Sequence, residues 1–263
     1  MRADQLLVQR GLAASRSQAV RLIESGAQWM SRQGWKPLSK SDDLPDDAQI
    51  ELHDAAEAKY VSRGGLKLDG ALAVSGLKVQ GKLCLDVGQS TGGFTDCLLH
   101  HGARCVVGID VGQGQLHARL RQDERVICVE KVNARNILAT DLIAACAYST
   151  MKISIFDSEN AGFELMVGDV SFISQTLMIE ALSKMLKPGS DVLMLVKPQF
   201  ELQPAQIGKG GIVKDPVHYA EVEKRIRASY AEHGLQVQKY FDSLITGGDG
   251  NREFFVHAVR TQT

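Results

Sequence analysis

Short apolar, strand-like runs alternate with helix-like segments along most of this chain, and this alternation limits its fold more than any other feature of the sequence. The apolar runs are Leu83–Val87, Cys105–Ile109, Val126–Val129, Glu164–Val167, Val192–Val196, Val237–Phe241 and Glu253–Val259. Helical patterns end at residue 101 and cover residues 137–147, 176–186 and 219–232. Repeated β–α alternation is typical of an α/β protein. We therefore predict a Rossmann-like parallel sheet with helices on both faces.

Two details of this alternation concern the later strands. Pro188 and Gly189 are expected to end the helix over residues 176–186 before the strand Val192–Val196 begins. The last two apolar runs are joined by a glycine-rich loop with no helical pattern. A parallel pair would need a longer crossover, so we expect these two strands to pair antiparallel.

Polar side chains stand at or just after the ends of successive predicted strands. They are Asp86, Asp110, Asn133, Asp169 and Lys197. In open parallel sheets, ligands bind beyond the carboxyl ends of the strands. A polar residue often ends a strand without any functional reason, and that explanation suffices for any one of these residues. It is weak for five in succession, so we predict a ligand site along this edge.

The segment Asp86–Phe94, which reads DVGQSTGGF, joins the first strand to its helix. Its glycines, at positions 88, 92 and 93, let the backbone pass close beneath a ligand. The segment differs from the dinucleotide-binding pattern GxGxxG because Ser90 replaces the second glycine, and it lacks the GK[ST] of a P-loop. An amino-acid-like ligand suits it better, because backbone groups and Asp86 can meet the ammonium and carboxylate of a methionine moiety.

Asp110, at the end of the second strand, extends this interpretation. Its carboxylate could accept both hydroxyls of a ribose, which favours a ligand with free 2′- and 3′-hydroxyls. S-adenosylmethionine combines such a ribose with an amino-acid moiety, so we predict it as the cofactor. The candidate cofactor-binding residues are Asp86, Gly88, Ser90, Thr91, Gly92, Gly93, Phe94, Asp110, Val111, Asn133 and Asp169.

The beginning of the chain is interpreted as a separate, small α+β domain. The predicted divisions are an N-terminal domain over residues 1–57, a connector over residues 58–61 and the α/β domain over residues 62–263. The expected N-terminal elements are helices over residues 2–10 and from Ser15 or Ser17 to Gly26, and strands over residues 27–30 and 49–52.

The charges of this N-terminal domain are segregated along the sequence. Residues 1–40 carry seven basic side chains and two acidic ones, whereas the stretch that follows is acidic. Such segregation indicates a basic binding face. A solvated helix face would carry the same charges, so charge alone leaves both interpretations open.

The cysteines and the first residues bear on where the protein works. The chain has five cysteines, none of them in a CxxC pair, and several stand in apolar runs. This pattern fits reduced, buried thiols in a cytoplasmic protein, and we predict no metal site. Residues 1–5 lack the apolar core of a signal peptide, and the chain has no run of about 18 apolar residues that could span a membrane.

Seven segments taken together resemble the TlyA family. They are Val61–Lys67, Asp86–Phe94, Asp110–Leu116, Asn133–Arg135, Gly168–Ser174, Leu195–Glu201 and Gly250–Phe255. Members of that family join an S4 RNA-binding domain to an FtsJ-like methyltransferase domain, and the resemblance covers essentially the whole chain. One departure is the polar stretch Lys152–Phe163, which is longer than is usual in the family.

The resemblance implies a function and a partner. Family members use S-adenosylmethionine to methylate the 2′-oxygen of cytidine in ribosomal RNA, so ribosomal RNA or a ribosomal subunit is the expected partner. The chain is similar to a shorter subgroup of the family, which implies 23S rRNA as the main substrate.

The resemblance also implies a catalytic set, and its members are Lys67, Asp169, Lys197 and Glu253. A ribose 2′-hydroxyl must lose its proton as it attacks a methyl group, and a neutral lysine amine can take that proton, although an ordinary lysine has a pKa of about 10.4. We assign Lys197 as the base and Lys67 as the neighbouring cation that tunes it and orients the hydroxyl. The two carboxylates are expected to hold the lysines by charged hydrogen bonds.

RNA contacts are expected from basic residues of the N-terminal domain and the start of the α/β domain. They are Arg2, Arg10, Arg16, Arg21 and Arg63, and such contacts are mainly made to phosphates.

The connector Ala58–Val61 could relay substrate docking to cofactor binding. The segment Gly208–Gly211, which reads GKGG, is similar to a phosphate loop only superficially and is expected to be a mobile loop near the substrate entrance.

Two other functions compete with the methyltransferase interpretation. A non-catalytic RNA-binding protein could retain a decayed methyltransferase fold, but the intact set of two lysines and two carboxylates argues against decay. A membrane-active haemolysin, the label that many TlyA members carry, would need a secretion signal or a membrane-inserting segment. The sequence shows neither.

Overall fold

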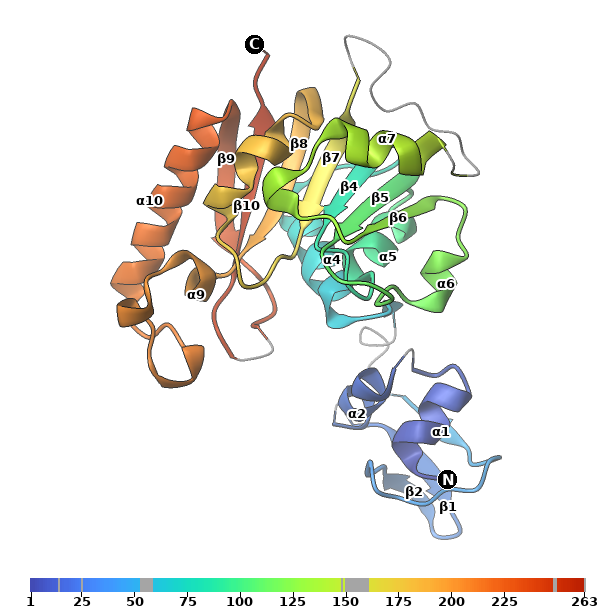
Figure 1. Cartoon of the computed structure of the whole chain (residues 1–263). Coiled ribbons are helices and arrows are strands. Elements are labelled where there is room, and N and C mark those ends of the chain that lie inside the picture. Colours follow the sequence, from blue (N-terminus) through green and yellow to red (C-terminus); the bar gives the residue numbers. More distant parts are fainter. Residues whose placement is uncertain are drawn as a thin grey trace.

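The computed structural model describes residues 1–13, 15–24, 26–52, 59–147, 149, 161–247 and 250–262. Two units are seen in these residues, a small N-terminal unit and a larger α/β unit (Figure 1). The predicted boundary at residue 57, the first residue of the connector and most of the polar stretch 152–163 lie outside the described residues.

The N-terminal unit packs two helices against a small antiparallel sheet of order β2-β1-β3. Its elements are α1 (Ala3–Gln9), α2 (Arg16–Glu24), β1 (Gln28–Ser31), β2 (Gly34–Pro37) and β3 (Ile50–Glu51). Leu6, Leu7 and Leu22 of the helices meet Leu44 in one core, and none is more than 2% exposed. Both predicted helices are present. The sequence did not predict β2, because its residues are mostly exposed and carry no alternating pattern.

The larger unit is built on a seven-stranded sheet of order β6-β5-β4-β7-β8-β10-β9. Its strands are β4 (Leu83–Val87), β5 (Cys105–Asp110), β6 (Val126–Glu130), β7 (Phe163–Gly168), β8 (Leu186–Val196), β9 (Leu235–Asp242) and β10 (Phe254–Arg260). The first five pair in parallel, and β10 is antiparallel to β8 and β9. The predicted α/β sheet and its antiparallel last pair are therefore confirmed.

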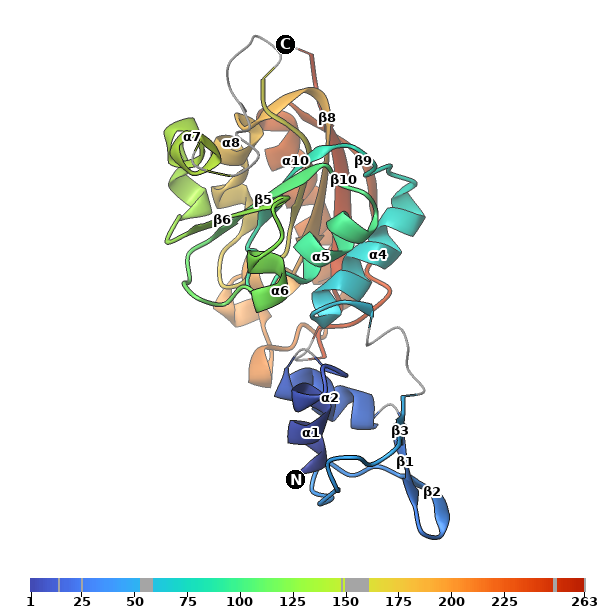
Figure 2. The ribbon, with the colours of Figure 1, turned by 90° about the vertical axis from the view of Figure 1, so that its right-hand side faces the viewer.

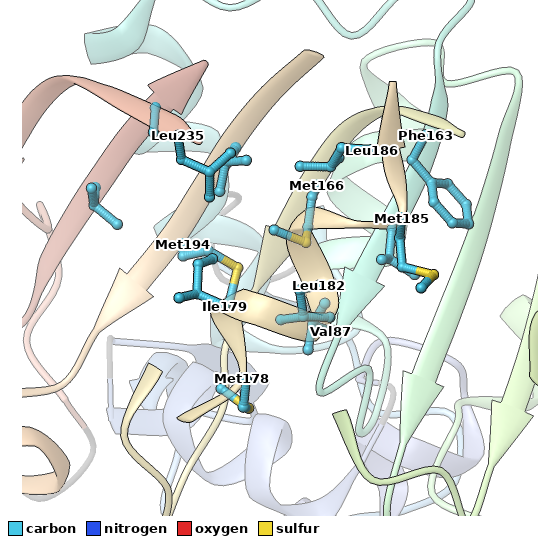
Figure 3. Close-up of a cluster of buried hydrophobic side chains, with 14 of the residues drawn as sticks. Val87, Phe163, Met166, Met178, Ile179, Leu182, Met185, Leu186, Met194 and Leu235 are labelled. Atoms are coloured by element: carbon cyan, nitrogen blue, oxygen red, sulfur yellow. The ribbon is translucent and has the colours of Figure 1, made fainter. Parts of the chain in front are cut away.

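Helices cover both faces of this sheet (Figures 1 and 2). One face packs against α4 (Arg63–Ser75), α5 (Gly93–His100) and α6 (Ala118–Arg121). The other packs against α7 (Ala139–Ala147), α8 (Ile179–Ser183) and α10 (Pro216–Glu232). Figure 3 shows part of the second core, where Met166 and Met194 of the sheet meet Ile179 and Leu182 of α8. Strand β4 lies between the two layers and all of its residues are buried, as expected of a central parallel strand.

One predicted boundary is wrong. Pro188-Gly189 does not separate a helix from a strand, because β8 already begins at Leu186. Phe163 of β7 pairs with Leu186. Leu165 pairs with Asp191, so the Pro-Gly turn bulges out within the strand and the strand resumes its pairing after it.

Two helices also differ from the prediction. The segment 176–186 holds a 3₁₀ turn (Gln175–Leu177), the short α8 and the start of β8. Helix α4 was not predicted, because its glycines weaken the helical pattern. Packing requires one of them: a Cβ on Gly65 would lie 2.4 Å from the ring of Tyr60.

The N-terminal unit lies beyond the end of the larger unit at which the parallel strands finish, and both ribbon views agree on this placement (Figures 1 and 2). The Gln18 side chain on α2 donates a hydrogen bond from Nε2 to the carbonyl oxygen of Tyr60 at 2.9 Å. The N-terminal unit therefore contacts the segment that leads into α4. No helix in the described part of the chain is long and apolar enough to cross a bilayer.

Candidate active site at the carboxyl edge of the sheet

The glycine-rich segment after β4 forms a tight turn that only small residues could follow. Gly88 has a φ of 80° and Gly92 a φ of 94°, both in the left-handed region. A Cβ on Gly88 would lie 2.9 Å from the carbonyl oxygen of Asp169. A Cβ on Gly93 would lie 2.2 Å from Ser62 Oγ, so α5 begins directly against the start of α4. The close packing of this turn, here called the glycine cradle, therefore depends on glycine at these positions.

A cavity of about 470 Å³ opens above this turn, a size suited to a small organic ligand. Residues predicted to bind the cofactor line much of it, and these are Gly88, Ser90, Thr91, Gly93, Phe94, Asp110, Val111, Asn133 and Asp169. Lys197 lines the same cavity. Gly92 and Asp86 do not line it, although both were predicted to bind the cofactor.

Asp86 instead lies behind the turn and is fully buried. Its Oδ2 accepts a 2.6 Å hydrogen bond from the Thr95 hydroxyl, which in turn accepts one from Gln89 Nε2 at 2.9 Å. Its Oδ1 has no hydrogen-bond partner among the described residues. Burial raises the pKa of Asp86 to about 7, with nearby Asp169 adding to the rise. Asp86 supports the turn from below.

Asp110 fixes the rim of the cavity. Its Oδ2 accepts a hydrogen bond from the Ser90 N–H and its Oδ1 accepts one from the Gly112 N–H, each at 2.7 Å. The Ser90 hydroxyl donates to Gln115 Oε1 at 3.1 Å. A carboxylate has about four acceptor positions, so two remain for ligand hydroxyls after these bonds.

Two lysine–carboxylate pairs belong to this site, and one of them, Lys197 with Asp169, lines the cavity. Lys67 Nζ of α4 is 2.5 Å from Glu253 Oε2, at the start of β10. Lys197 Nζ, at the end of β8, is 2.5 Å from Asp169 Oδ1 and donates a hydrogen bond to Ser171 Oγ at 2.8 Å. These four residues are the predicted catalytic set. The structure brings them together from four separate segments.

The two pairs form one electrostatic cluster. Burial raises the pKa of Glu253, and Lys67 opposes this rise most strongly. Asp169 and Lys197 also act on the same carboxyl, the first raising its pKa and the second lowering it. The charges of both pairs therefore act on the Glu253 carboxyl, which places the two pairs in one site.

A buried polar network holds the segment between Asp169 and α8, and the sequence did not predict it. Glu201 accepts hydrogen bonds from the Ser174 hydroxyl at 2.5 Å and the Gln175 N–H at 2.8 Å. The Gln175 side chain donates to the carbonyl oxygen of Leu195 and accepts from the Tyr230 hydroxyl. Burial raises the pKa of Glu201. No local pattern reveals these contacts, because they join residues up to 55 positions apart.

Phe172 is a second feature that sequence patterns missed. Its backbone has a φ of 65°, which is unusual for a bulky residue. Its side chain is 90% exposed, lines the cavity and lies with its ring 5.1 Å from that of Phe200. A strained backbone that holds an aromatic ring in solvent at a cavity mouth points to a functional role.

Comparison with known proteins identifies the family. Residues 60–260 match the model of the FtsJ-like methyltransferase family. This chain belongs to the FtsJ-like methyltransferases. The 16S/23S rRNA (cytidine-2′-O)-methyltransferase TlyA of Mycobacterium tuberculosis is 37% identical, covering 100% of this chain and 90% of that protein. Hemolysin A of Brachyspira hyodysenteriae is 36% identical, covering 98% of this chain and 100% of that protein.

A solved structure agrees with these relatives. A hemolysin-named protein from Streptococcus thermophilus superposes with a TM-score of 0.71 and 36% identity, covering 100% of this chain and 89% of that one. The predicted resemblance to the TlyA family is therefore confirmed. Names with "hemolysin" and names with "methyltransferase" both occur among relatives of this one FtsJ-like chain.

The predicted RNA-binding arginines of this FtsJ-like protein also stabilise its N-terminal unit. Arg16 Nη2 and Arg2 Nε contact the buried carboxylate of Asp4 at 2.7 and 3.1 Å, and the Arg16 hydrogen bond holds the Asp4 pKa below its ordinary value. Arg10 donates to the carbonyl oxygens of Asp46 and Ala48. The Arg2 and Arg16 side chains remain 50% and 60% exposed, so both can also meet a ligand.

The other two predicted arginines lie closer to the FtsJ-like domain. Arg21 is on α2, the helix that contacts Tyr60 through Gln18. Arg63 begins α4 and donates from Nη2 to the carbonyl oxygen of Thr246 at 3.5 Å. All five arginines therefore lie in or next to the N-terminal unit.

One group of side chains has the composition of a metal site. Possible ligand atoms of Asp69, Cys97 and His101 lie within 4.8 Å of one another. Asp69 already pairs with Lys59 at 2.7 Å and with His101 at 2.7 Å. Burial raises the pKa of the Cys97 thiol well above its ordinary value, which disfavours the thiolate that metals bind. The group is charge-balanced without an ion.

Proposed function

We propose that this protein transfers a methyl group from S-adenosylmethionine to the ribose 2′-oxygen of a cytidine in ribosomal RNA. One observation carries the proposal: Lys197 and Asp169 lie in the same cavity as the glycine cradle. A group that accepts a proton thus lies beside the space for a nucleoside-like methyl donor. A Campylobacter jejuni relative, 30% identical over 99% of this chain, is named a 23S rRNA (cytidine-2′-O)-methyltransferase, and we propose 23S rRNA as the main substrate.

The cradle and the rim fit the cofactor that we propose. Glycines at positions 88 and 93 line the cavity, and so does Asn133. Asp110 has acceptor positions for ribose hydroxyls. Asp86 would act on the cofactor through the turn and not by contact, because it is fully buried behind it. S-adenosylmethionine supplies the sulfonium methyl group that is transferred.

Lys197 is the base in this proposal. Its amine would accept the proton of the 2′-hydroxyl as the oxygen forms its bond to the methyl carbon and the bond from that carbon to the sulfonium sulfur breaks. S-adenosylhomocysteine would leave as the neutral thioether, and the proton would pass to solvent. Asp169 Oδ1 and Ser171 Oγ, at 2.5 and 2.8 Å, fix the position of Nζ. A positioned base contributes roughly 10²–10⁴-fold to a rate, and alignment of the reacting groups contributes further.

Lys67 and Glu253 act as positioning residues in this proposal. Their contact ties α4 to β10 behind the cavity, and neither side chain lines the cavity itself. The Lys67 ammonium would add positive potential to the site, which favours a developing negative charge on the acceptor oxygen.

We further propose that residues 1–57 form an S4-like RNA-binding domain, joined by residues 58–61 to the methyltransferase domain at 62–263. Its place beyond the carboxyl edge of the sheet supports this, because a bound RNA could contact both units at once (Figures 1 and 2). The arginines at positions 2, 10, 16, 21 and 63 would contact phosphates. The partner would be ribosomal RNA or a ribosomal subunit, and the reaction would take place in the cytoplasm.

Cofactor binding and methyl transfer test the proposal separately. Calorimetry should show that the wild-type protein and Lys197→Ala bind S-adenosylmethionine with similar affinity. Tritium-methyl transfer to unmodified ribosomal RNA should be lost only in the variant. Full transfer by Lys197→Ala would refute the assignment of the base. Cofactor binding without transfer to any ribosomal RNA or subunit would favour a non-catalytic RNA-binding protein.

A further inference from the structure

The segment over residues 208–214, which reads GKGGIVK and is here called the GKGG turn, lies close in sequence to the candidate active site. Lys197 ends β8, the short helix α9 (Pro198–Glu201) follows at once, and the GKGG turn comes soon after. Residues 208–211 are all exposed. Gly210 and Gly211 both have a φ of 80°, so backbone conformation and not packing requires glycine at these positions.

The GKGG turn is held in place by side chains outside it. Asn251, which is 1% exposed, donates from Nδ2 to the carbonyl oxygen of Gly211 and accepts from the N–H of Val213, each at 3.0 Å. The Tyr219 hydroxyl donates to the carbonyl oxygen of Val213 at 2.8 Å. Asn251 stands two residues before Glu253 in the sequence. The turn is therefore fixed relative to the segment that carries Glu253, whereas the sequence predicted a mobile loop.

Two lysines make this turn positively charged. Lys209 and Lys214 are both exposed, and neither forms an ion pair within the described ranges. The Lys214 side chain folds back over the turn, and its Cε lies 3.8 Å from the position that a Cβ on Gly208 would occupy. Asp215 follows Lys214 directly, and its Oδ1 accepts a hydrogen bond from the Val217 N–H at the start of α10. The turn thus presents to solvent two lysines that form no ion pair within the described ranges.

The turn also lies on the side from which an RNA would approach. In both ribbon views it projects, near α9, from the end of the larger unit that faces the N-terminal unit (Figures 1 and 2). It does not line the cofactor cavity. Its two lysines are exposed, so a nucleic acid that reached this end of the larger unit could contact them.

We propose that the GKGG turn is a second RNA-contact element, in which Lys209 and Lys214 bind phosphates next to the methylated nucleotide. The inference rests on the proposed function, because it assumes an RNA acceptor at Lys197. Phosphate contacts by lysine fix the register of a nucleic acid without reading its sequence. The N-terminal unit and the GKGG turn would then hold the RNA at two places, with the target ribose between them.

The test compares the double variant Lys209→Glu/Lys214→Glu with Lys78→Glu. Lys78 is an exposed lysine that precedes β4, at the opposite edge of the sheet. Methyl transfer to unmodified 23S rRNA is measured over a range of salt concentrations. The double variant should raise the KM for RNA by about tenfold or more and change kcat less than about twofold. Its plot of log kcat/KM against log salt should become shallower by about two units, because roughly 0.9 counterions are released per phosphate contact.

Several outcomes would overturn the inference. An unchanged KM and salt slope in the double variant would do so, as would an equal effect of Lys78→Glu. If the double variant lost cofactor binding, the neutral pair Lys209→Gln/Lys214→Gln would decide by the same salt slope. If the wild-type protein transferred no methyl group, the proposed function would fail on its own. RNA-binding titrations of the wild-type protein and the double variant would then still test the turn, and equal affinities would contradict it.

Discussion

Lys67 and Glu253 stand 186 positions apart in the sequence, yet Lys67 Nζ and Glu253 Oε2 meet at 2.5 Å with both side chains almost fully buried. The contact joins the first helix of the methyltransferase domain to the start of its last strand, β10. Burial raises the pKa of Glu253, and the Lys67 ammonium opposes that rise. The carboxylate therefore depends on its partner to remain charged inside the protein.

Replacing one partner should expose this dependence. Lys67→Met leaves the Glu253 carboxylate buried without a partner, and the free energy of unfolding should fall by about 3–5 kcal/mol at neutral pH. The loss should shrink as the pH falls, because a protonated Glu253 carries no charge. Chemical denaturation over a range of pH measures both effects. The double variant Lys67→Met/Glu253→Gln should recover part of the stability, and a double variant no more stable than the single one would contradict the interpretation.

Asp86 should make stability depend on pH. Its pKa is about 7 in the folded protein and about 3.9 in an unfolded chain. The folded state therefore holds the proton more tightly, and this contribution to stability is complete below about pH 4 and is lost as the pH rises through 7.

Asp86→Asn removes the titration and keeps an acceptor for the Thr95 hydroxyl. The stability of Asp86→Asn relative to wild type should therefore increase between pH 4 and 7, by at most about 1.4 kcal/mol per pH unit, and then stay level. Thermal unfolding of both proteins without cofactor is the measurement. A stability difference that did not vary with pH would show that Asp86 is not held protonated.

Gly93 should be required for the close packing of the glycine cradle against α4, and therefore for cofactor affinity. In Gly93→Ala, the new Cβ would lie 2.2 Å from Ser62 Oγ and 2.9 Å from the Gly65 backbone nitrogen. Relieving such overlap typically costs about 1–3 kcal/mol, and the affinity for S-adenosylmethionine should fall. Adding Ser62→Gly should restore only part of it, because the Gly65 backbone remains. Calorimetry that found wild-type affinity in Gly93→Ala would rule out the close packing of α4 against α5.

Phe172 should lower the stability of the fold and support its activity on RNA. A left-handed backbone costs a bulky residue roughly 1–2 kcal/mol, whereas asparagine adopts it more readily. Phe172→Asn should therefore raise Tm. If the exposed ring contacts the RNA, Phe172→Asn should also raise the KM for RNA in methyl-transfer assays. Phe172→Leu keeps the strain and removes the ring, so it should impair RNA use without raising Tm. Wild-type transfer by both variants would leave the ring without a role.

The sequence predicts those parts of the site that depend on local pattern. Asp110 and Lys197 stand at the ends of their strands, and strand ends are visible as the limits of apolar runs. Asp86 stands inside its strand, and whether its side chain faces the cavity depends on which face of the sheet it occupies. A single strand with both faces buried gives no signal for that choice, so the predicted contact with the cofactor could not be distinguished from support of the turn.

Other features depend on partners far away in the chain. The bulge in β8 arises because Phe163 of β7 pairs with Leu186 and Leu165 pairs with Asp191, which leaves the Pro-Gly turn between the two paired positions. A Pro-Gly pair considered without this pairing predicts a boundary between a helix and a strand. The network of Glu201, Gln175 and Tyr230 likewise forms only when three distant segments pack together. Helix α4 needs Gly65 to admit the Tyr60 ring, so the glycine that weakens its pattern is also the residue that lets it pack.

Mapping of 2′-O-methylation in ribosomal RNA shows whether this protein methylates a cytidine ribose and whether Lys197 is needed for it. Unmodified 23S rRNA or large subunits are incubated with S-adenosylmethionine and either the wild-type protein or Lys197→Ala, and each ribose methylation is located by mass spectrometry of RNA fragments. We expect one cytidine to gain a 2′-O-methyl group with the wild-type protein and none to gain it with Lys197→Ala. Methylation on a base atom, or ribose methylation that persists in Lys197→Ala, would contradict it.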